Sequence, residues 1–189
     1  AVRLGSVGRS LLGQIPEKAL IELHGSFADT GRGHGTDKAI IAGLLGLLPQ
    51  DTRLRDSLTL ASAAGIEYEF RNVDLGDEVH PNTCRITLRA QEQILKYVGK
   101  SIGGGLIEIT HLNDYAVNFT GDLDCLIVIG DDQPGTINQI TGWLLEHKIN
   151  VAYFSVNRQQ RGGKAVMIIQ TDQPIPNNLV SELRQQPWT

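Results

Sequence analysis

The chain has 189 residues, of which 41% are hydrophobic and 20% are charged, and its formal net charge at pH 7 is -4. This composition is that of a globular protein large enough for two small cores, and we expect two domains. Its Lys and Arg residues are scattered, so it lacks the basic stripe that nucleic-acid binding requires. The longest apolar run, residues 39–48, is about half the length of a membrane-spanning helix, and no signal pattern opens the chain. We therefore expect a soluble, cytoplasmic protein.

The first half of the chain is predicted to mix helices and strands. Apolar residues near helical spacing predict a short helix within 1–13, and 36–48 predicts a buried helix that Pro49 ends. Gly43 and Gly46 within it are expected to allow close approach of another backbone. An amphipathic helix is expected between a capping Asp51 and Gly65. Alternating patterns predict five strands, at residues 19–23, 67–73, 83–89, 93–98 and 106–110.

Residues 30–38, Thr-Gly-Arg-Gly-His-Gly-Thr-Asp-Lys, form a glycine-rich loop before the buried helix. Three alternating glycines expose backbone around Arg32 and His34, and Thr36 is expected to cap the helix. A carboxylate or phosphate could be held there by the Arg fork and by free N–H groups at the helix start. A tight turn between a strand and a helix, and a surface that docks onto another protein, are the alternatives.

Two other polar segments could each be either a plain turn or part of a contact site. His80-Pro81-Asn82-Thr83 precedes a predicted strand, and most such segments are only turns. Gly103-Gly104-Gly105 is either a hairpin loop or a place where another backbone approaches closely.

The chain contains no obvious catalytic or metal-binding pattern. Its only cysteines, Cys84 and Cys125, occupy apolar strand positions and are expected to be buried. An iron–sulfur cluster takes three or four thiolates, so this chain cannot hold one alone. The His, Asp and Cys residues of the first half lack zinc-site spacing, and neither a Ser-His-Asp order nor a Walker-type loop is present. An independent enzyme is not expected.

The last third of the chain changes character. Leu126 to Ile129 is a continuous apolar strand, and the turn Asp-Gln-Pro-Gly leads into a helix. Strands at 151–156 and 164–170 and a helix from Asn177 follow. The order β-α-β-β-α supplies five of the six elements of a ferredoxin-like βαββαβ unit, and the last strand is missing.

Several motifs resemble those of one enzyme family. Residues 21–47, IELHGSFADTGRGHGTDKAIIAGLLGL, resemble the β-chain of the iron–sulfur-dependent bacterial L-serine dehydratases, as do His-Pro-Asn-Thr with Arg85 and the segment 101–105. The last third resembles an ACT domain, an amino-acid-sensing module. The resemblance covers nearly the whole chain. It implies an α+β protein with a serine dehydratase β-type (allosteric substrate-binding) domain at 1–120 and an ACT domain at 121–189 that lacks its last strand.

The same resemblance implies a function. The chain would be the β-chain of an L-serine ammonia-lyase, which converts L-serine to pyruvate and ammonia, and would be inactive alone. A separate α-chain would carry the four-iron four-sulfur cluster, while this chain regulates or completes the pocket. The alternative is a free-standing amino-acid sensor with no enzyme partner.

The resemblance also implies two sets of site residues. A small anion or the α-chain would be contacted by Arg32, Gly33, His34, Gly35, Thr36, His80, Asn82, Gly103 and Gly104. An amino-acid effector would be held across a dimer interface by Asp132, Gly135 and Asn150. The serine-binding version of the ACT domain has a histidine where Gly130 stands and an asparagine where Asp132 stands. An ACT domain that only dimerises is the alternative, and the open sheet edge left by the missing strand favours self-association.

Overall fold

The computed structural model describes residues 1–189, and contacts divide them into two compact units, Ala1–Asp114 and Tyr115–Thr189. The division falls at residue 114, whereas the predicted domain boundary is at residue 120. No helix in the chain is both long enough and apolar enough to cross a membrane.

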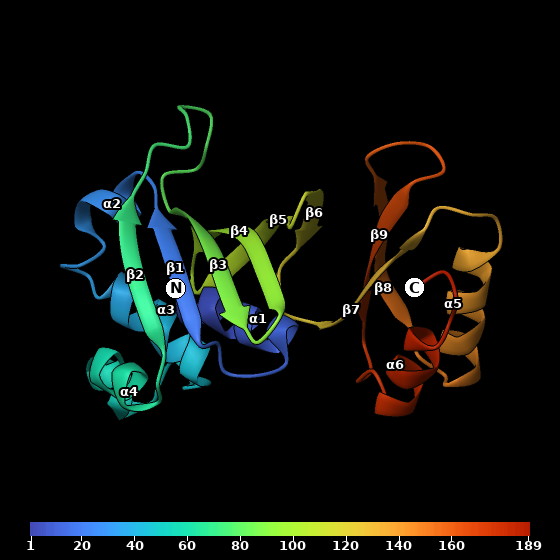
Figure 1. The fold of residues 1–189 in the computed structure, drawn as a ribbon, viewed down its shortest axis with the longest axis horizontal. Helices are drawn as coiled ribbons and strands as arrows, with labels where there is room; N and C mark the ends of the chain where they lie inside the picture. The colour runs from blue at the N-terminus through green and yellow to red at the C-terminus, as the bar shows by residue number, and fades with distance from the viewer. The chain divides into compact units, whose positions relative to one another are not determined.

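The first unit is one mixed sheet with helices on one face (Figure 1). Its elements in chain order are α1 (Val2–Leu12), β1 (Lys18–Leu23), α2 (Ser26–Thr30), α3 (Thr36–Leu45), a 3-10 turn (Thr52–Asp56), α4 (Ser57–Ala63), β2 (Glu67–Asn72), β3 (Thr83–Ala90), β4 (Gln93–Gly103) and β5 (Leu106–Leu112). The strand order in this unit is β2-β1-β3-β4-β5, in which β1 and β2 are parallel and the other pairs are antiparallel.

Strict alternation along the strands separates a buried face from a polar face. On β3 the side chains of Cys84, Ile86 and Leu88 are fully buried, while Arg85 and Arg89 lie on the other face. The buried face is covered by α1 and α3 (Figure 1). The opposite face carries most of the charged strand residues, as the period of two requires.

The two covering helices approach each other closely at glycines. A Cβ on Gly43 of α3 would lie 2.0 Å from Val2 O, and a Cβ on Gly5 of α1 would lie 2.0 Å from Ile40 O. The predicted close approach at Gly43 is therefore confirmed. The same prediction for Gly46 is wrong, because Gly46 ends α3 in the left-handed conformation at φ 81° and any β-carbon there is strained.

Other predictions near α3 also need correction. The helix ends at Leu45, before Pro49, because Gly46 already stops it. Thr36 does not cap α3: Gly35 occupies the cap position at φ 71°, and Thr36 is the first helical residue and is buried. The chain also forms the short helix α2 before the glycine-rich loop, so the loop does not follow a strand directly. The predicted cap at Asp51 is confirmed, because its carboxylate accepts a hydrogen bond from Arg53 N.

The second unit contains the predicted β-α-β-β-α order. Its elements are β6 (Tyr115–Phe119), β7 (Asp124–Asp131), α5 (Thr136–Glu146), β8 (Val151–Arg158), β9 (Lys164–Thr171) and α6 (Asn177–Arg184). The antiparallel sheet β7-β9-β8 packs on α5 and α6 through a core that includes Val128, Ile140 and Ile169. Strand β6 was not predicted, since its five residues are too few for a clear periodic signal.

The chain after α6 lies beside β7, where a last ferredoxin-like strand would lie. Asp131 N donates a hydrogen bond to Trp188 O at 2.7 Å, and no strand forms there. A Cβ on Gly130 would meet Trp188 O at 2.6 Å. Glycine at position 130 is therefore explained by the close approach of the C-terminal residues.

Candidate functional site

The end of β1 and the start of β3 meet the turn that contains His80. His24 N donates to Thr83 O at 3.0 Å, and a Cβ on Gly25 would lie 2.7 Å from Pro81 Cα. At the other side of β3, Ser101 N donates to Asn82 O at 2.9 Å. Segments that are distant in sequence thus converge at one end of the sheet.

The turn at His80 is tightly organised. His80 Nδ1 accepts a hydrogen bond from Asn82 N at 3.1 Å, and Thr83 Oγ1 donates to His80 O at 2.6 Å. Because Nδ1 is an acceptor, the neutral imidazole carries its proton on Nε2 and can donate from that atom. Two residues of this turn, His80 and Asn82, were predicted to contact an anion or the α-chain. His80 can offer its Nε2–H as a donor, whereas Asn82 makes its hydrogen bonds through its backbone N and O.

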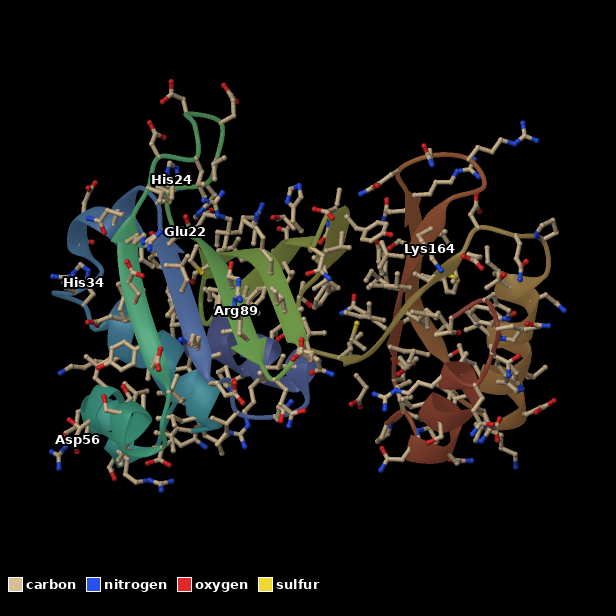
Figure 2. The ribbon with its side chains drawn as sticks, in the orientation of Figure 1. Glu22, His24, His34, Asp56, Arg89 and Lys164 are labelled. Atoms are coloured by element: carbon tan, nitrogen blue, oxygen red, sulfur yellow. The ribbon has the colours of Figure 1, made fainter.

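A residue that the sequence analysis did not select, His24, anchors the connection between β2 and β3. The side chain is buried, and its Nδ1 accepts a hydrogen bond from Leu75 N at 3.1 Å. Asp74 Oδ1 lies 3.9 Å from the same nitrogen. Figure 2 shows His24 beside the end of β1, at the base of this connection. A polar residue that directly follows a buried strand was the signal that could have identified it.

The glycine-rich loop between α2 and α3 is exposed at its centre. The side chains of Arg32 and His34 are exposed and have no hydrogen-bonding partner in the chain, and Figure 2 shows His34 on the segment after α2. The three glycines differ in their roles. A Cβ on Gly31 would lie 2.2 Å from Phe27 O, and Gly35 has φ 71°, whereas a Cβ on Gly33 would make only an ordinary contact, 3.5 Å from Thr30 O.

The start of α3 has fewer free backbone N–H groups than we expected from the sequence. Thr36 N donates to Gly31 O at 2.7 Å, and Lys38 N donates to the carboxylate of Asp37 at 2.8 Å. The Asp37 carboxylate also occupies the first turn, where it offsets the positive end of the helix dipole. An anion would therefore be bound here mainly by Arg32 and His34.

The predicted glycines at the β4–β5 hairpin form the turn itself. Gly103, Gly104 and Gly105 have φ of 92°, 61° and 81°, and nothing lies within 4 Å of a Cβ built on any of them. Conformation alone explains glycine at these positions. The hairpin-loop alternative is thus observed, and contact with another chain at this turn stays a prediction.

The polar face of the sheet next to His80 is hollowed into a groove of about 400 Å³. Its walls include Arg85, Lys96, Lys100 and His111, while Arg32 and His34 are not among its lining residues. The predicted anion site residues are therefore divided between this groove and the glycine-rich loop.

An ion pair lies at one side of the groove. Arg85 Nε and Nη2 donate to the two carboxylate oxygens of Glu22, at 2.5 and 2.6 Å. These hydrogen bonds from Arg85 hold the pKa of the Glu22 carboxyl below its usual value, although partial burial acts in the opposite direction. Arg85 keeps Nη1 available for other partners.

The three predicted effector residues lie apart within the second unit. Strand register pairs Asp131 with Lys164 and pairs both Asp124 and Val151 with Thr171, so Asp132 and Asn150 are at opposite ends of the sheet. Gly135 occupies the cap position of α5 at φ 95°. One copy of the chain cannot place all three around one small ligand.

Both polar effector residues already have partners. The Asp132 carboxylate accepts from Arg158 Nη1 at 2.5 Å and from Gly162 N at 3.2 Å, and these bonds lower its pKa. Asn150 Nδ2 donates to Asp172 Oδ2 at 2.6 Å. A ligand at either residue would have to replace an internal hydrogen bond.

The cysteines do not fit an iron–sulfur cluster. Cys84 is fully buried, and Cys125 is half-buried. Burial raises the pKa of the Cys84 thiol to about 12 and that of Cys125 to about 11, so neither is a thiolate at neutral pH. No group of three or more His, Cys, Asp or Glu side chains is placed to hold a metal ion. The donors that a cluster requires are not present in this chain.

Comparison with known proteins gives a consistent result for the two parts of the chain. Residues 8–73 match the family model "Serine dehydratase beta chain", and residues 126–187 match the ACT domain. The chain is 42% identical over 187 residues to a probable L-serine dehydratase β-chain of Bacillus subtilis, covering 99% of this chain and 84% of that protein. It is 32% identical over 184 residues to an L-serine dehydratase β-chain of Peptoniphilus asaccharolyticus, covering 97% and 83%.

The chain is also similar in sequence to part of an enzyme with another name. A D-3-phosphoglycerate dehydrogenase of Synechocystis is 26% identical over 186 residues, which are 97% of this chain and 33% of that enzyme.

Proposed function

Since the chain belongs to the serine dehydratase β-chain family, we propose that it is the non-catalytic β-chain of an L-serine dehydratase and acts with an α-chain to convert L-serine to pyruvate and ammonia. The names of two relatives support this function over a free-standing amino-acid sensor: the matches cover 84% and 83% of these proteins' own length, and both proteins are named as dehydratase β-chains. The four-iron four-sulfur cluster belongs to the α-chain in this proposal, because the two cysteines here cannot ligate it.

The observation that carries the proposed contact with the α-chain is the glycine-rich loop. Arg32 and His34 are exposed and unpartnered, while Gly33 between them is needed neither for backbone conformation nor for internal packing. A backbone left bare between two polar side chains can be approached closely by another protein. Asp37 at the helix start makes an anion a less favourable occupant, so we assign the loop mainly to the α-chain.

Reconstitution with the α-chain tests this assignment. Arg32→Ala and Gly33→Ala should each reduce pyruvate release from L-serine in the mixture by tenfold or more, roughly the loss of one charge-assisted contact or one close approach. Both variants should melt within about 2 °C of the parent chain, since surface changes cost little stability. Gly31→Ala is the matched control, because its Cβ would clash with Phe27 O and should lower the melting temperature.

The result that would contradict the assignment is equally clear. If Arg32→Ala destabilises the isolated chain and leaves the turnover of the mixture intact, the loop is only structural.

Iron and sulfide analysis of each chain, with pyruvate assays of each chain and of the mixture, tests the placement of the cluster. Full activity of this chain alone would exclude a non-catalytic role.

Effector binding by the second unit requires a second copy. Asp132 and Asn150 lie at opposite ends of one sheet, so only two copies could bring one of each to a single amino acid. In this three-stranded sheet β7 and β8 are the outer strands, and because the C-terminal residues already contact β7 at Asp131, β8 is the better edge for such self-association. Light scattering should show a dimer or larger species, and Asn150→Ala should weaken amino-acid binding measured by calorimetry. A monomer that binds no amino acid would exclude this site.

A further inference from the structure

The groove on the polar face of the first unit has a regular arrangement around one apolar residue. Val98 of β4 lies opposite Arg85 of β3 and opposite His111 of β5. Lys96 and Lys100 precede and follow it on the same face of β4, each about 6.6 Å away along the strand. Val98 is therefore surrounded by four basic side chains, and all five residues line the groove.

The connection between β2 and β3 forms the remaining wall. Leu75, Val79 and His80 line the groove from this segment, and the bond from Leu75 N to His24 Nδ1 holds the segment in place. His80 contributes an Nε2–H donor, because its Nδ1 accepts from Asn82 N. The site thus combines an apolar floor and wall with donors on several sides, which is typical of small-molecule sites.

Charge pairing on this face leaves a cation at the groove. Arg85 is bound to Glu22, and Lys100 Nζ lies 3.2 Å from Glu108 Oε2. Lys96 forms no ion pair of its own, although its charge also helps to lower the pKa of the nearby Glu22 carboxyl, and His111 is hydrogen-bonded only to Thr110. The acidic residue that lines the groove, Glu78, is exposed.

We propose that this groove binds a small organic anion with two carboxylates. Lys96 and the free Nη1 of Arg85 are available to one carboxylate. The other can accept from His80 Nε2–H and from the ammonium N–H groups of Lys100 that do not point to Glu108. A short carbon chain between the carboxylates would contact Val98, Leu75 and Val79. A bare inorganic anion would leave these apolar groups unused.

Titration calorimetry on the full 189-residue chain, at an ionic strength of about 0.1 M where the Debye length is about 10 Å, tests the proposal without a partner chain. Succinate is the probe, and acetate and inorganic phosphate are compared with it. Succinate should bind with one site per chain, at least tenfold more tightly than acetate or phosphate. Lys96→Ala should weaken succinate binding by about tenfold or more, the usual effect of losing one charge-assisted contact.

Arg89→Ala provides the matched control. Arg89 lies on the same face of β3, is exposed and has no ion-pair partner, but it does not line the groove, and removing it changes the net charge equally. Its succinate affinity should stay within about twofold of the parent value, since screening weakens distant charges. Circular dichroism checks that both variants fold.

Three results would overturn the proposal. Equal weakening by Lys96→Ala and Arg89→Ala would show a general charge effect, and failure of all three probes to bind would exclude an anion site. Phosphate binding as tight as succinate binding would exclude a role for the apolar floor. None of these results bears on the contact between the glycine-rich loop and the α-chain, because Arg32 and His34 lie outside the groove.

Discussion

The contact between α1 and α3 predicts the effect of a single added methyl group at Gly43. In Gly43→Ala the Cβ would lie 2.0 Å from Val2 O and 2.7 Å from Ser6 N, and both atoms are backbone, so no rotamer change relieves the clash. An ordinary contact begins at 3.4 Å, so the helices must separate by about 1.4 Å, the difference between 3.4 and 2.0 Å. That separation loosens the contact between α1 and α3, two helices whose residues Leu4, Ile40 and Leu44 are fully buried.

The magnitude follows from two opposed effects. Overpacking a tight core contact typically lowers the free energy of unfolding by about 1–3 kcal/mol, and we take the upper value of about 3 kcal/mol because both contacted atoms are backbone. Replacing a helical glycine by alanine raises the free energy of unfolding by about 1 kcal/mol. The expected net loss is about 2 kcal/mol, which lowers the melting temperature of a unit of this size by about 8 °C. Circular dichroism at 222 nm is the assay.

Gly142→Ala in α5 is the matched comparison. Nothing lies within 4 Å of a Cβ at this position, so only the gain in helix propensity remains, and the variant should be stabilised by about 1 kcal/mol. The only tryptophans, Trp143 and Trp188, are both in the second unit, so their fluorescence reports its unfolding. If Gly43→Ala stabilises the chain as Gly142→Ala does, the close packing of α1 on α3 is refuted.

Three further predictions concern titratable groups. The Cys84 thiol should resist alkylation at pH 8 in the folded chain, because burial raises its pKa to about 12. It should react once guanidinium chloride unfolds the chain, and mass spectrometry of the alkylated chain measures both results. Glu22 should contribute to acid stability: Arg85 lowers its pKa, so its contribution is complete above about pH 4.5 and is lost as the pH falls through the lower folded-state pKa. Glu22→Gln should flatten this acid limb of a denaturant-unfolding profile, and an unchanged limb would contradict the assigned ion pair. Asp132→Ala should speed amide hydrogen exchange over residues 159–163, because Arg158 and the hairpin lose their acceptor, and unchanged exchange would show that this contact does not hold the hairpin.

The sequence by itself determined much of the local structure and the limits on chemistry. Alternation and helical spacing depend on neighbours a few residues apart, so they located β3, the buried α3 and the β-α-β-β-α order of the second unit. The count of two cysteines was sufficient to show that this chain lacks the three or four thiolates that an iron–sulfur cluster takes. The short elements α2 and β6 were missed, because five residues carry too little periodicity.

Only the tertiary structure decided which residues share a site. Arg85, Lys96 and His111 surround Val98 because the registers of β3, β4 and β5 align them, and no local pattern encodes that alignment. The role of each glycine was decided in the same way. Gly43 meets a backbone from α1, whereas Gly33 meets only an ordinary contact. Register and helix packing arise from contacts between segments distant in the chain, and these contacts exist only once the chain has folded.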